Sequence, residues 1–253
     1  MARMRACGRV RRGSISTRPA RSCRAPTREY PVKILGLDTA LGALSAALVE
    51  DGTVLARDWR EMARGHAEAL APMVDRLMGE AAWAYASLDR IAVTTGPGTF
   101  TGQRVGIAFA RALALALKKP AIGITTLDAM MEEALAKDGA SWAIAASDAK
   151  RGEIYLGIRS RQRAVLPPEL IALDAAASRI APFAEEWGKT VLVCGTAAEM
   201  LIPLLQAAGC DVTDGSVRQP DALWVARLAA GETEGAAPRP LYLRPPDAKL
   251  PVP

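Results

Sequence analysis

V-K-I-L-G-L-D, residues 32–38, is an apolar run that ends in an acid, and it begins the part of the chain that decides the fold. A short turn follows and leads into a second apolar run, Ala43–Val49. Asp51-Gly52 comes next, and Asp-Gly between two apolar runs is typical of a hairpin turn. Val54–Trp59 then supplies a third strand, so this region predicts a meander of three strands.

The same arrangement begins again in the second part of the chain. Trp142–Ser147 is an apolar run that ends at Asp148, and after a turn Glu153–Arg159 alternates apolar and polar residues as a strand does. A strand, an acid, a turn and a strand that occur twice predict two similar α/β halves. We therefore expect a first half at residues 32–130 and a second half at residues 131–253.

The net charge conceals a large difference between the first residues and the rest. The formal charge of the 253 residues is +5, but residues 1–31 hold nine arginines and a single acid, Glu29. Residues 32–253 therefore hold 23 basic and 26 acidic side chains, a net charge of −3. A body of this charge does not predict a broad nucleic-acid surface, so we expect contact with nucleic acid to be shared with a partner. We expect residues 1–31 to be a disordered extension or to follow from a start codon assigned too far upstream, although their composition also fits a transit peptide.

The composition excludes several classes of protein. Half of the residues are hydrophobic and 23% are charged, as in a globular protein with a sizeable core. His66 is the one histidine, and no Cys-x-x-Cys pair occurs, so we expect reduced thiols, a cytoplasmic location and no bound metal. Val105–Leu117 is the most apolar stretch, and it is too short for the roughly 20 residues that span a membrane. The four cysteines are Cys7, Cys23, Cys194 and Cys210.

G-P-G-T-F-T-G, residues 96–102, joins a short buried strand to a long apolar helix. A glycine-rich turn before a helix presents free N–H groups and the positive end of the helix dipole, which suits an anion or a phosphate. The candidate anion contacts are Gly96, Gly98 and Thr99 in this loop, with Lys150 and Arg151 at a charged hairpin tip. Alternatively, the glycines only let the strand and the helix pack closely, and the charged tip is a solvated turn.

Two acids end strands beside tight turns, namely Asp38 and Asp148. Such a pair could hold a metal-bound phosphate, or each acid could accept a hydrogen bond within its own turn. We interpret His66, near Glu68 at the start of a helix, as a surface or capping residue. No serine lies in a G-x-S-x-G elbow, so the sequence indicates no catalytic residue.

Two helices carry faces that either pack within the fold or meet another subunit. One helix has an apolar stripe at helical spacing, which consists of Leu70, Met73, Val74, Leu77 and Met78. The helix after the glycine-rich loop has a face of small residues, which consists of Gly102, Gly106, Ala110 and Ala114. Small residues allow another backbone to approach closely.

Five segments together resemble one known family. They are Ile34–Thr39, His66–Glu68, Gly96–Gly102, Asp148–Tyr155 and Pro240–Arg244. They occur in the order found in the TsaB family, also called YeaZ, and the resemblance covers roughly residues 32–247. The sequence departs from the family pattern at three positions where serine, leucine and arginine are common, namely Ala40, Gln103 and Lys150. The missing hydroxyl at position 40 weakens the case for direct phosphate binding.

The resemblance implies a fold of two ribonuclease-H-like halves, the actin, Hsp70 and sugar-kinase (ASKHA) architecture. It implies a non-catalytic subunit of the complex that attaches threonylcarbamoyl to N6 of adenosine 37 in tRNAs reading codons that begin with A. Such a subunit pairs with the catalytic paralogue TsaD, helps to form a platform for the P-loop ATPase TsaE, and meets tRNA only through the complex. It also implies that the apolar stripe is the partner interface, that no cofactor is needed, and that two copies can pair without the partner.

Two other functions stay open at this point. The chain could be an autonomous ATP-dependent kinase or ATPase of the same fold, with Asp38, Asp148 and the glycine-rich loop around the nucleotide. It could also be a glycoprotease-like peptidase, although the single histidine argues against the metal site that such an enzyme needs.

Overall fold

The computed structural model describes residues 31–184, 186–187, 190–232 and 237–244. The expectation for the N-terminal extension therefore lies outside the described residues, apart from Pro31. Residues 245–253, the end of the expected second half, lie outside them as well.

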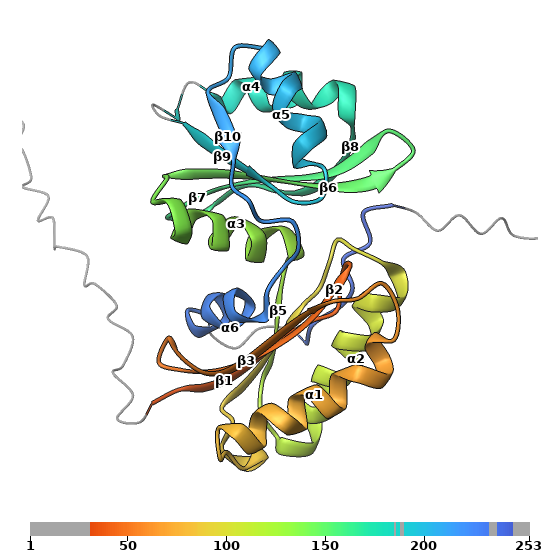
Figure 1. The fold of residues 1–253 in the computed structure, drawn as a ribbon, viewed down its shortest axis with the longest axis vertical. Helices are drawn as coiled ribbons and strands as arrows, with labels where there is room; N and C mark the ends of the chain where they lie inside the picture. The colour runs from red at the N-terminus through yellow and green to blue at the C-terminus, as the bar shows by residue number, and fades with distance from the viewer. Residues whose placement is uncertain (1–30, 185, 188–189, 233–236, 245–253) are drawn as a thin grey trace, which may run out of the picture. The chain divides into compact units, whose positions relative to one another are not determined.

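The first five-stranded sheet has the order β3-β2-β1-β4-β5 (Figure 1). Strands β1, β2 and β3 pair antiparallel, which confirms the predicted meander, and β4 and β5 continue the sheet parallel to β1. Its strands are β1 (Lys33–Asp38), β2 (Ala43–Glu50), β3 (Thr53–Glu61), β4 (Arg90–Thr94) and β5 (Ala121–Ile124). Helices α1 (His66–Glu80) and α2 (Phe100–Leu117) pack against it, and the short 3₁₀ turn η1 (Tyr85–Ser87) precedes β4.

The second sheet repeats this topology, with the order β8-β7-β6-β9-β10. Strands β6, β7 and β8 again pair antiparallel, while β9 and β10 continue parallel to β6. This repetition confirms the prediction of two similar α/β halves. The elements are β6 (Trp142–Lys150), β7 (Glu153–Ser160), β8 (Ala164–Ala172), η2 (Leu173–Ala175), α4 (Ala176–Ala184), β9 (Val191–Cys194), α5 (Ala198–Ala207) and β10 (Val212–Asp214).

Two helices lie between the sheets, and their packing differs from the boundary between the two halves that the sequence suggests. Helix α3 (Thr126–Asp138) packs on β6, β7 and β9, so the expected boundary between residues 130 and 131 falls inside a helix of the second lobe. Helix α6 (Ala222–Ala230) returns to the first sheet and packs on β1, β2 and β4, and it also contacts α3. Gly36 allows this return, because a Cβ at this position would overlap the carbonyl oxygen of Ala222.

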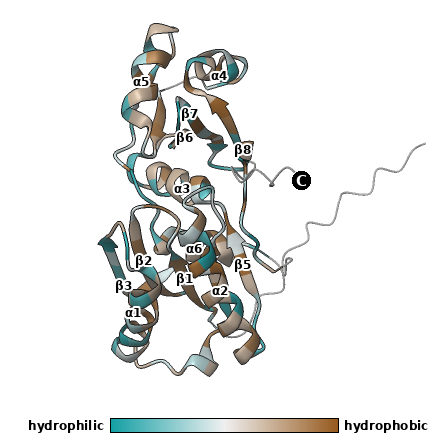
Figure 2. Ribbon diagram, turned by 90° about the vertical axis from the view of Figure 1, so that its right-hand side faces the viewer, coloured by the Kyte–Doolittle hydropathy of each residue, from teal (hydrophilic) through white to brown (hydrophobic). Residues whose placement is uncertain are grey.

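The core of the first lobe corrects the expected partner interface. All five residues of the apolar stripe are only 0–3% exposed, and they pack in one cluster with residues of β1, β2 and α2. Their burial contradicts direct contact between these side chains and another protein in this conformation. In Figure 2, teal marks polar residues of α1 and β3, whereas brown residues lie along α2 and the central strands.

The small-residue face of α2 is also used within the lobe. A Cβ on Gly102 would overlap the backbone oxygen of Thr39, and one on Gly106 would lie 2.5 Å from the Thr39 hydroxyl. Intramolecular packing is therefore the correct alternative for this face, because the turn after β1 occupies the space in front of it.

Candidate functional site

The glycine-rich loop packs directly on the turn that follows β1. Gly98 has no room for a Cβ beside the carbonyl oxygen of Ala40, and the N–H of Thr99 donates to that same oxygen at 2.8 Å. The Thr99 hydroxyl accepts from the Gly102 N–H at 3.2 Å and caps α2. The Thr99 N–H, one of the expected anion donors, is therefore engaged within the fold, and the glycines serve close packing.

Asp38 is buried at the end of β1, beside this loop. Its Oδ1 accepts hydrogen bonds from the Thr94 hydroxyl at 2.6 Å and from the Ala40 N–H at 3.1 Å. Its Oδ2 has no hydrogen-bond partner among the described residues. The pKa of Asp38 is raised to about 7, mainly by burial and to a lesser degree by the nearby charge of Asp221, against the opposing effect of the hydrogen bonds from Thr94 and Ala40.

Asp221 is a buried acid near Asp38 whose structural role sequence reasoning missed. Its carboxylate caps α6 by accepting from the Leu223 N–H at 2.8 Å, and it forms an ion pair with Arg57 of β3. Ser45 of β2 accepts from the Ala222 N–H at 2.9 Å, next to this pair. These contacts fix the start of the returning helix on the first sheet. An acid before an apolar run is an N-cap signal, but the sequence does not show that the cap faces a strand far away in the chain.

Asp148, the counterpart of Asp38, lies in a different environment at the β6–β7 hairpin. Its carboxylate binds the Lys150 ammonium at 2.6 Å and accepts from the Lys150 N–H at 2.7 Å, and these contacts lower its pKa. Lys150 and Arg151 both have positive φ angles, 64° and 60°, and both are exposed at the hairpin tip. The expected pair of acids therefore consists of one buried carboxyl and one partly exposed carboxylate with its own cation.

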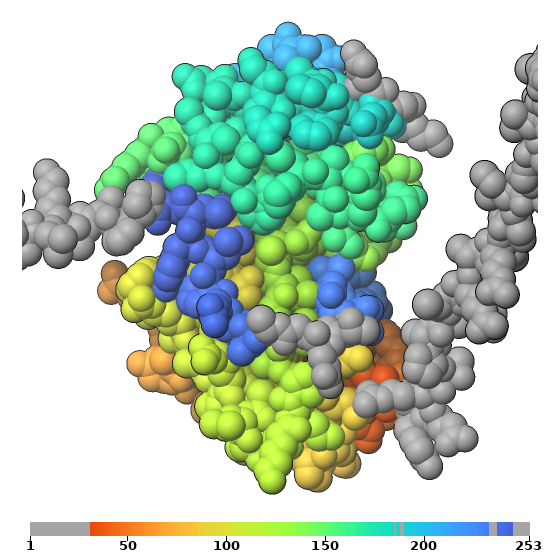
Figure 3. Space-filling view, turned by 180° about the vertical axis from the view of Figure 1, so that it is seen from behind, coloured from red at the N-terminus to blue at the C-terminus, as the bar shows by residue number. Residues whose placement is uncertain are grey.

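A C-terminal segment, residues 238–244, connects the glycine-rich loop region with this hairpin. The Leu241 N–H donates to the Thr95 carbonyl at 2.8 Å. Arg244 forms an ion pair with Glu153 and donates to the Lys150 carbonyl at 3.5 Å. Figure 3 shows this dark blue segment on the surface of the molecule. It brings together the two regions that the sequence assigned to anion contact.

His66 is not a surface residue, contrary to its interpretation from the sequence. Its ring is buried, and Nε2 lies 3.2 Å from the Ala43 carbonyl oxygen, so the side chain joins the start of α1 to β2. Among the described residues, no group of three or more His, Cys, Asp or Glu is placed to hold a metal ion. Over the same part of the chain, no helix is long and apolar enough to cross a membrane.

The repeated strand order, the two central helices and the acid at or near the end of the first strand of each sheet define a class. The molecule is a two-lobed α/β protein of ribonuclease-H-like halves, the class that includes actin, Hsp70 and the sugar kinases.

Comparisons with known proteins lead from the class to a family. The family model "TsaD: tRNA N6-adenosine threonylcarbamoyltransferase" matches residues 60–191. The "tRNA threonylcarbamoyladenosine biosynthesis protein TsaB" of Escherichia coli (strain K12) is 34% identical over 229 residues, which cover 84% of this chain and 95% of that protein. The structure "YeaZ from Pseudomonas aeruginosa" has a TM-score of 0.70 and 29% identity, and the match covers 84% of this chain and all of that one. A second Pseudomonas aeruginosa structure, described as similar to peptidase YEAZ, matches the same share of each chain with a TM-score of 0.74 and 29% identity. The chain belongs to the TsaB (YeaZ) family.

Proposed function

We propose that this chain is the non-catalytic partner of a TsaD-type enzyme in the synthesis of threonylcarbamoyladenosine in tRNA. The observation that carries the proposal is the match to TsaB across 95% of the Escherichia coli protein. The TsaD family model also matches residues 60–191, which supports a partner of the same fold. The proposal includes adenosine 37 of tRNAs that read codons beginning with A, TsaE as a further member of the complex, and the cytoplasm as the place of action.

The partner surface that we propose is the outer side of α1 and α2, rather than the buried stripe beneath it. These two helices lie side by side over one face of the first sheet (Figure 1). Their exposed alanines recur every four residues, so each set lies along one side of its helix. Exposed small residues let the helices of a partner approach closely. The exposed alanines are Ala67 and Ala71 in α1 and Ala108, Ala112 and Ala116 in α2.

The anion contact that we propose is limited to the tip of the β6–β7 hairpin. Lys150 and Arg151 are exposed there, and Arg244 holds the tip through the Lys150 carbonyl. Gly96, Gly98 and Thr99 serve the loop's packing instead, which weakens their part in the expected anion site. An anion at this tip would be shared with the partner, because the Lys150 ammonium already binds the Asp148 carboxylate at 2.6 Å.

Size-exclusion chromatography with a TsaD-type protein tests the pairing. We expect the chain to co-elute with that protein, and we expect Ala112→Glu to abolish co-elution because it puts a charge on the helix face. Ala207→Glu, at an exposed alanine of α5 in the second lobe, is the matched control and should co-elute normally. A pair of two copies of this chain, formed when the TsaD-type protein is absent, should respond to Ala112→Glu in the same way.

Catalysis by the chain alone would overturn the proposal. Threonylcarbamoyl transfer to tRNA, or ATP hydrolysis that Asp38→Ala abolishes, would assign the chain to the enzymes of its fold class. Normal co-elution of Ala112→Glu would exclude the outer side of α2 as the partner surface.

A further inference from the structure

Helix α2 and its C-cap residue carry three exposed cations that form no ion pair among the described residues. Arg104 and Arg111 are seven residues apart, so they lie on one side of the helix, two turns or about 10 Å apart, and Lys118 follows seven residues later as the C-cap residue just beyond the last turn. We call these three residues the basic ridge. All three are exposed, and none forms an ion pair with another described residue. Helix α2 contains no aspartate or glutamate, so nothing on the helix itself neutralises the ridge.

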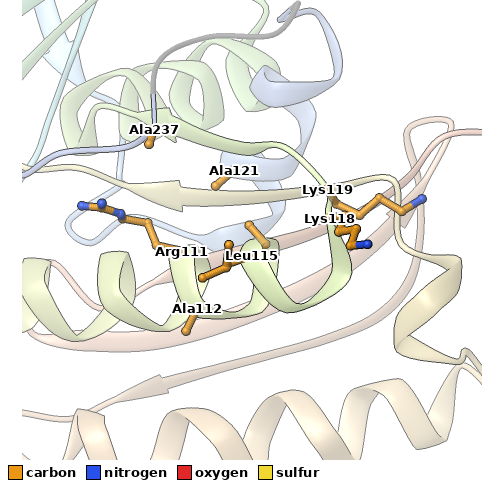
Figure 4. A pocket seen from close by; sticks show the side chains of 8 residues that line it. Arg111, Ala112, Leu115, Lys118, Lys119, Ala121 and Ala237 are labelled. Carbon is orange, nitrogen blue, oxygen red and sulfur yellow. The ribbon is translucent and has the colours of Figure 1, made fainter.

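A cavity of about 650 Å³ lies at the end of the ridge that is nearer to β5. Arg111, Lys118 and Lys119 line it, and the other described residues of its lining are alanine and leucine. One of them is Ala112, so the cavity lies at the border of the proposed partner surface. Figure 4 shows Arg111 on one side of Leu115 and the two lysines on the other side. Lys119 also lies 4.0 Å from Asp89, outside the lining. A hollow with three cations and no acid in its described lining concentrates positive potential.

Two exposed aromatic rings lie at the other end of the ridge. Phe100 and Tyr242 stack with their centroids 5.6 Å apart, although they are 58% and 48% exposed. The Arg104 guanidinium lies 3.7 Å from the Phe100 centroid, and its Nε donates to the Tyr242 hydroxyl at 2.8 Å. Stacked rings that stay open to solvent beside an arginine can accept a further flat group.

The spacing and the rings together select the kind of ligand. Cations about 10 Å apart cannot converge on one small anion, but they can follow an extended polyanion. An acidic peptide would satisfy the charges alone, whereas a nucleic acid also offers bases that stack on aromatic rings. The ridge is a local feature, because residues 32–253 carry a net charge of −3.

We propose that the basic ridge and the Phe100–Tyr242 pair bind RNA, with the phosphate backbone along α2 and a base against the rings. The identity of the RNA as the tRNA substrate of the complex rests on the proposed function. The chain would then contact tRNA directly, beyond the expectation that it meets tRNA only through its partner.

The test measures binding of an unmodified tRNA transcript to the complex of this chain with its TsaD-type partner. The variant Arg111→Gln/Lys118→Gln removes two cations of the ridge, and Lys137→Gln/Arg163→Gln removes two exposed cations of the second lobe as a matched control. Dissociation constants are measured at several salt concentrations. We expect the ridge variant to bind about tenfold more weakly near 0.15 M salt, and its log–log salt slope to fall by about two. The control should behave as the unmodified chain does, and the KM for tRNA should rise only in the ridge variant.

Two results would overturn the inference, and a third result separates it from a failure of the proposed function. Equal affinities and equal salt slopes in the two variants would exclude the ridge as an RNA contact. Loss of co-elution with the TsaD-type protein in the ridge variant alone would reassign the ridge to a protein contact. If the unmodified chain does not co-elute, the proposed function fails, and binding of the same transcript by the chain alone decides the inference independently.

Discussion

Replacing Asp38 by asparagine should change how the stability of the chain depends on pH. The carboxyl is buried with an unpaired Oδ2, and its pKa in the folded state is about 7, against an ordinary value of 3.8. Between these values the folded chain binds a proton that the unfolded chain has released. Folding is therefore most favoured by this group below about pH 4, and the free energy of unfolding falls as the pH rises toward 7.

The size of this change in the free energy of unfolding follows from the difference between the two pKa values of Asp38. Each unit of pKa corresponds to about 1.4 kcal/mol, so the shift from 3.8 to about 7 corresponds to a loss on the order of 4 kcal/mol. Asparagine keeps the shape of the side chain and does not titrate. We therefore expect Asp38→Asn to match the unmodified chain near pH 4 and to exceed its stability by up to that amount at pH 8.

Urea unfolding followed by circular dichroism at pH 4, 5, 6, 7 and 8 measures this difference. Other titrating groups cancel, because both chains contain them. Asp148→Asn is the control with the opposite sign, since Lys150 lowers the pKa of Asp148 and the stabilisation by this pair is lost as the pH falls. A difference between Asp38→Asn and the unmodified chain that stays constant from pH 4 to pH 8 would refute the assignment of a buried, protonated Asp38.

Three further predictions follow from the packing. Gly36→Ala should lower the free energy of unfolding in urea by at least about 2 kcal/mol, because its Cβ would overlap the Ala222 carbonyl. Gly79→Ala, which has open space around it in α1, should raise that free energy by up to about 1 kcal/mol. Equal effects of the two substitutions would contradict the close contact of α6 with β1. Leu77→Ala should cost about 2–5 kcal/mol as a core truncation, and a stability unchanged in thermal unfolding would mean that the stripe is not in the core. Arg244→Gln should speed amide hydrogen exchange at residues 150–153, measured by mass spectrometry, because the ion pair with Glu153 of the hairpin is lost. Protection equal to that of the unmodified chain would show that the C-terminal segment does not hold the hairpin tip.

The repeated unit of the fold could be predicted because its signals are local. Strand β1, the hairpin at Asp51-Gly52 and the restart at Trp142 are visible in runs of a few residues. Strand β8 gave no such signal, since two prolines interrupt its pattern, and only its place at the edge of the sheet makes them tolerable. The extent of the first lobe was missed for another reason. Helix α6 joins it from the far end of the chain, and no local pattern shows such a return.

In the candidate site, too, the features with local signals could be predicted and those that depend on distant contacts could not. The glycine-rich loop was recognised from its composition, but the choice between anion contact and packing depended on the Ala40 carbonyl, which only the tertiary structure brings to Thr99. The stripe from Leu70 to Met78 was recognised as apolar, yet periodicity does not distinguish a core face from a docking face. The role of Asp221 was missed because its partner, Arg57, lies in β3 of the same lobe but far away in the chain.

The return of α6 to the first sheet has a consequence for the order in which the protein is made. Ile34, Ala47, Val49 and Ala92 belong to a cluster that α6 completes with Ala222, Val225 and Ala226. A ribosome synthesises these strands long before it reaches residue 222. One side of the nascent first sheet therefore lacks the packing of α6 until the second lobe has been synthesised. A chain truncated before α6 would therefore expose these apolar strand residues to solvent, so the first lobe completes its core only after the second lobe has been synthesised.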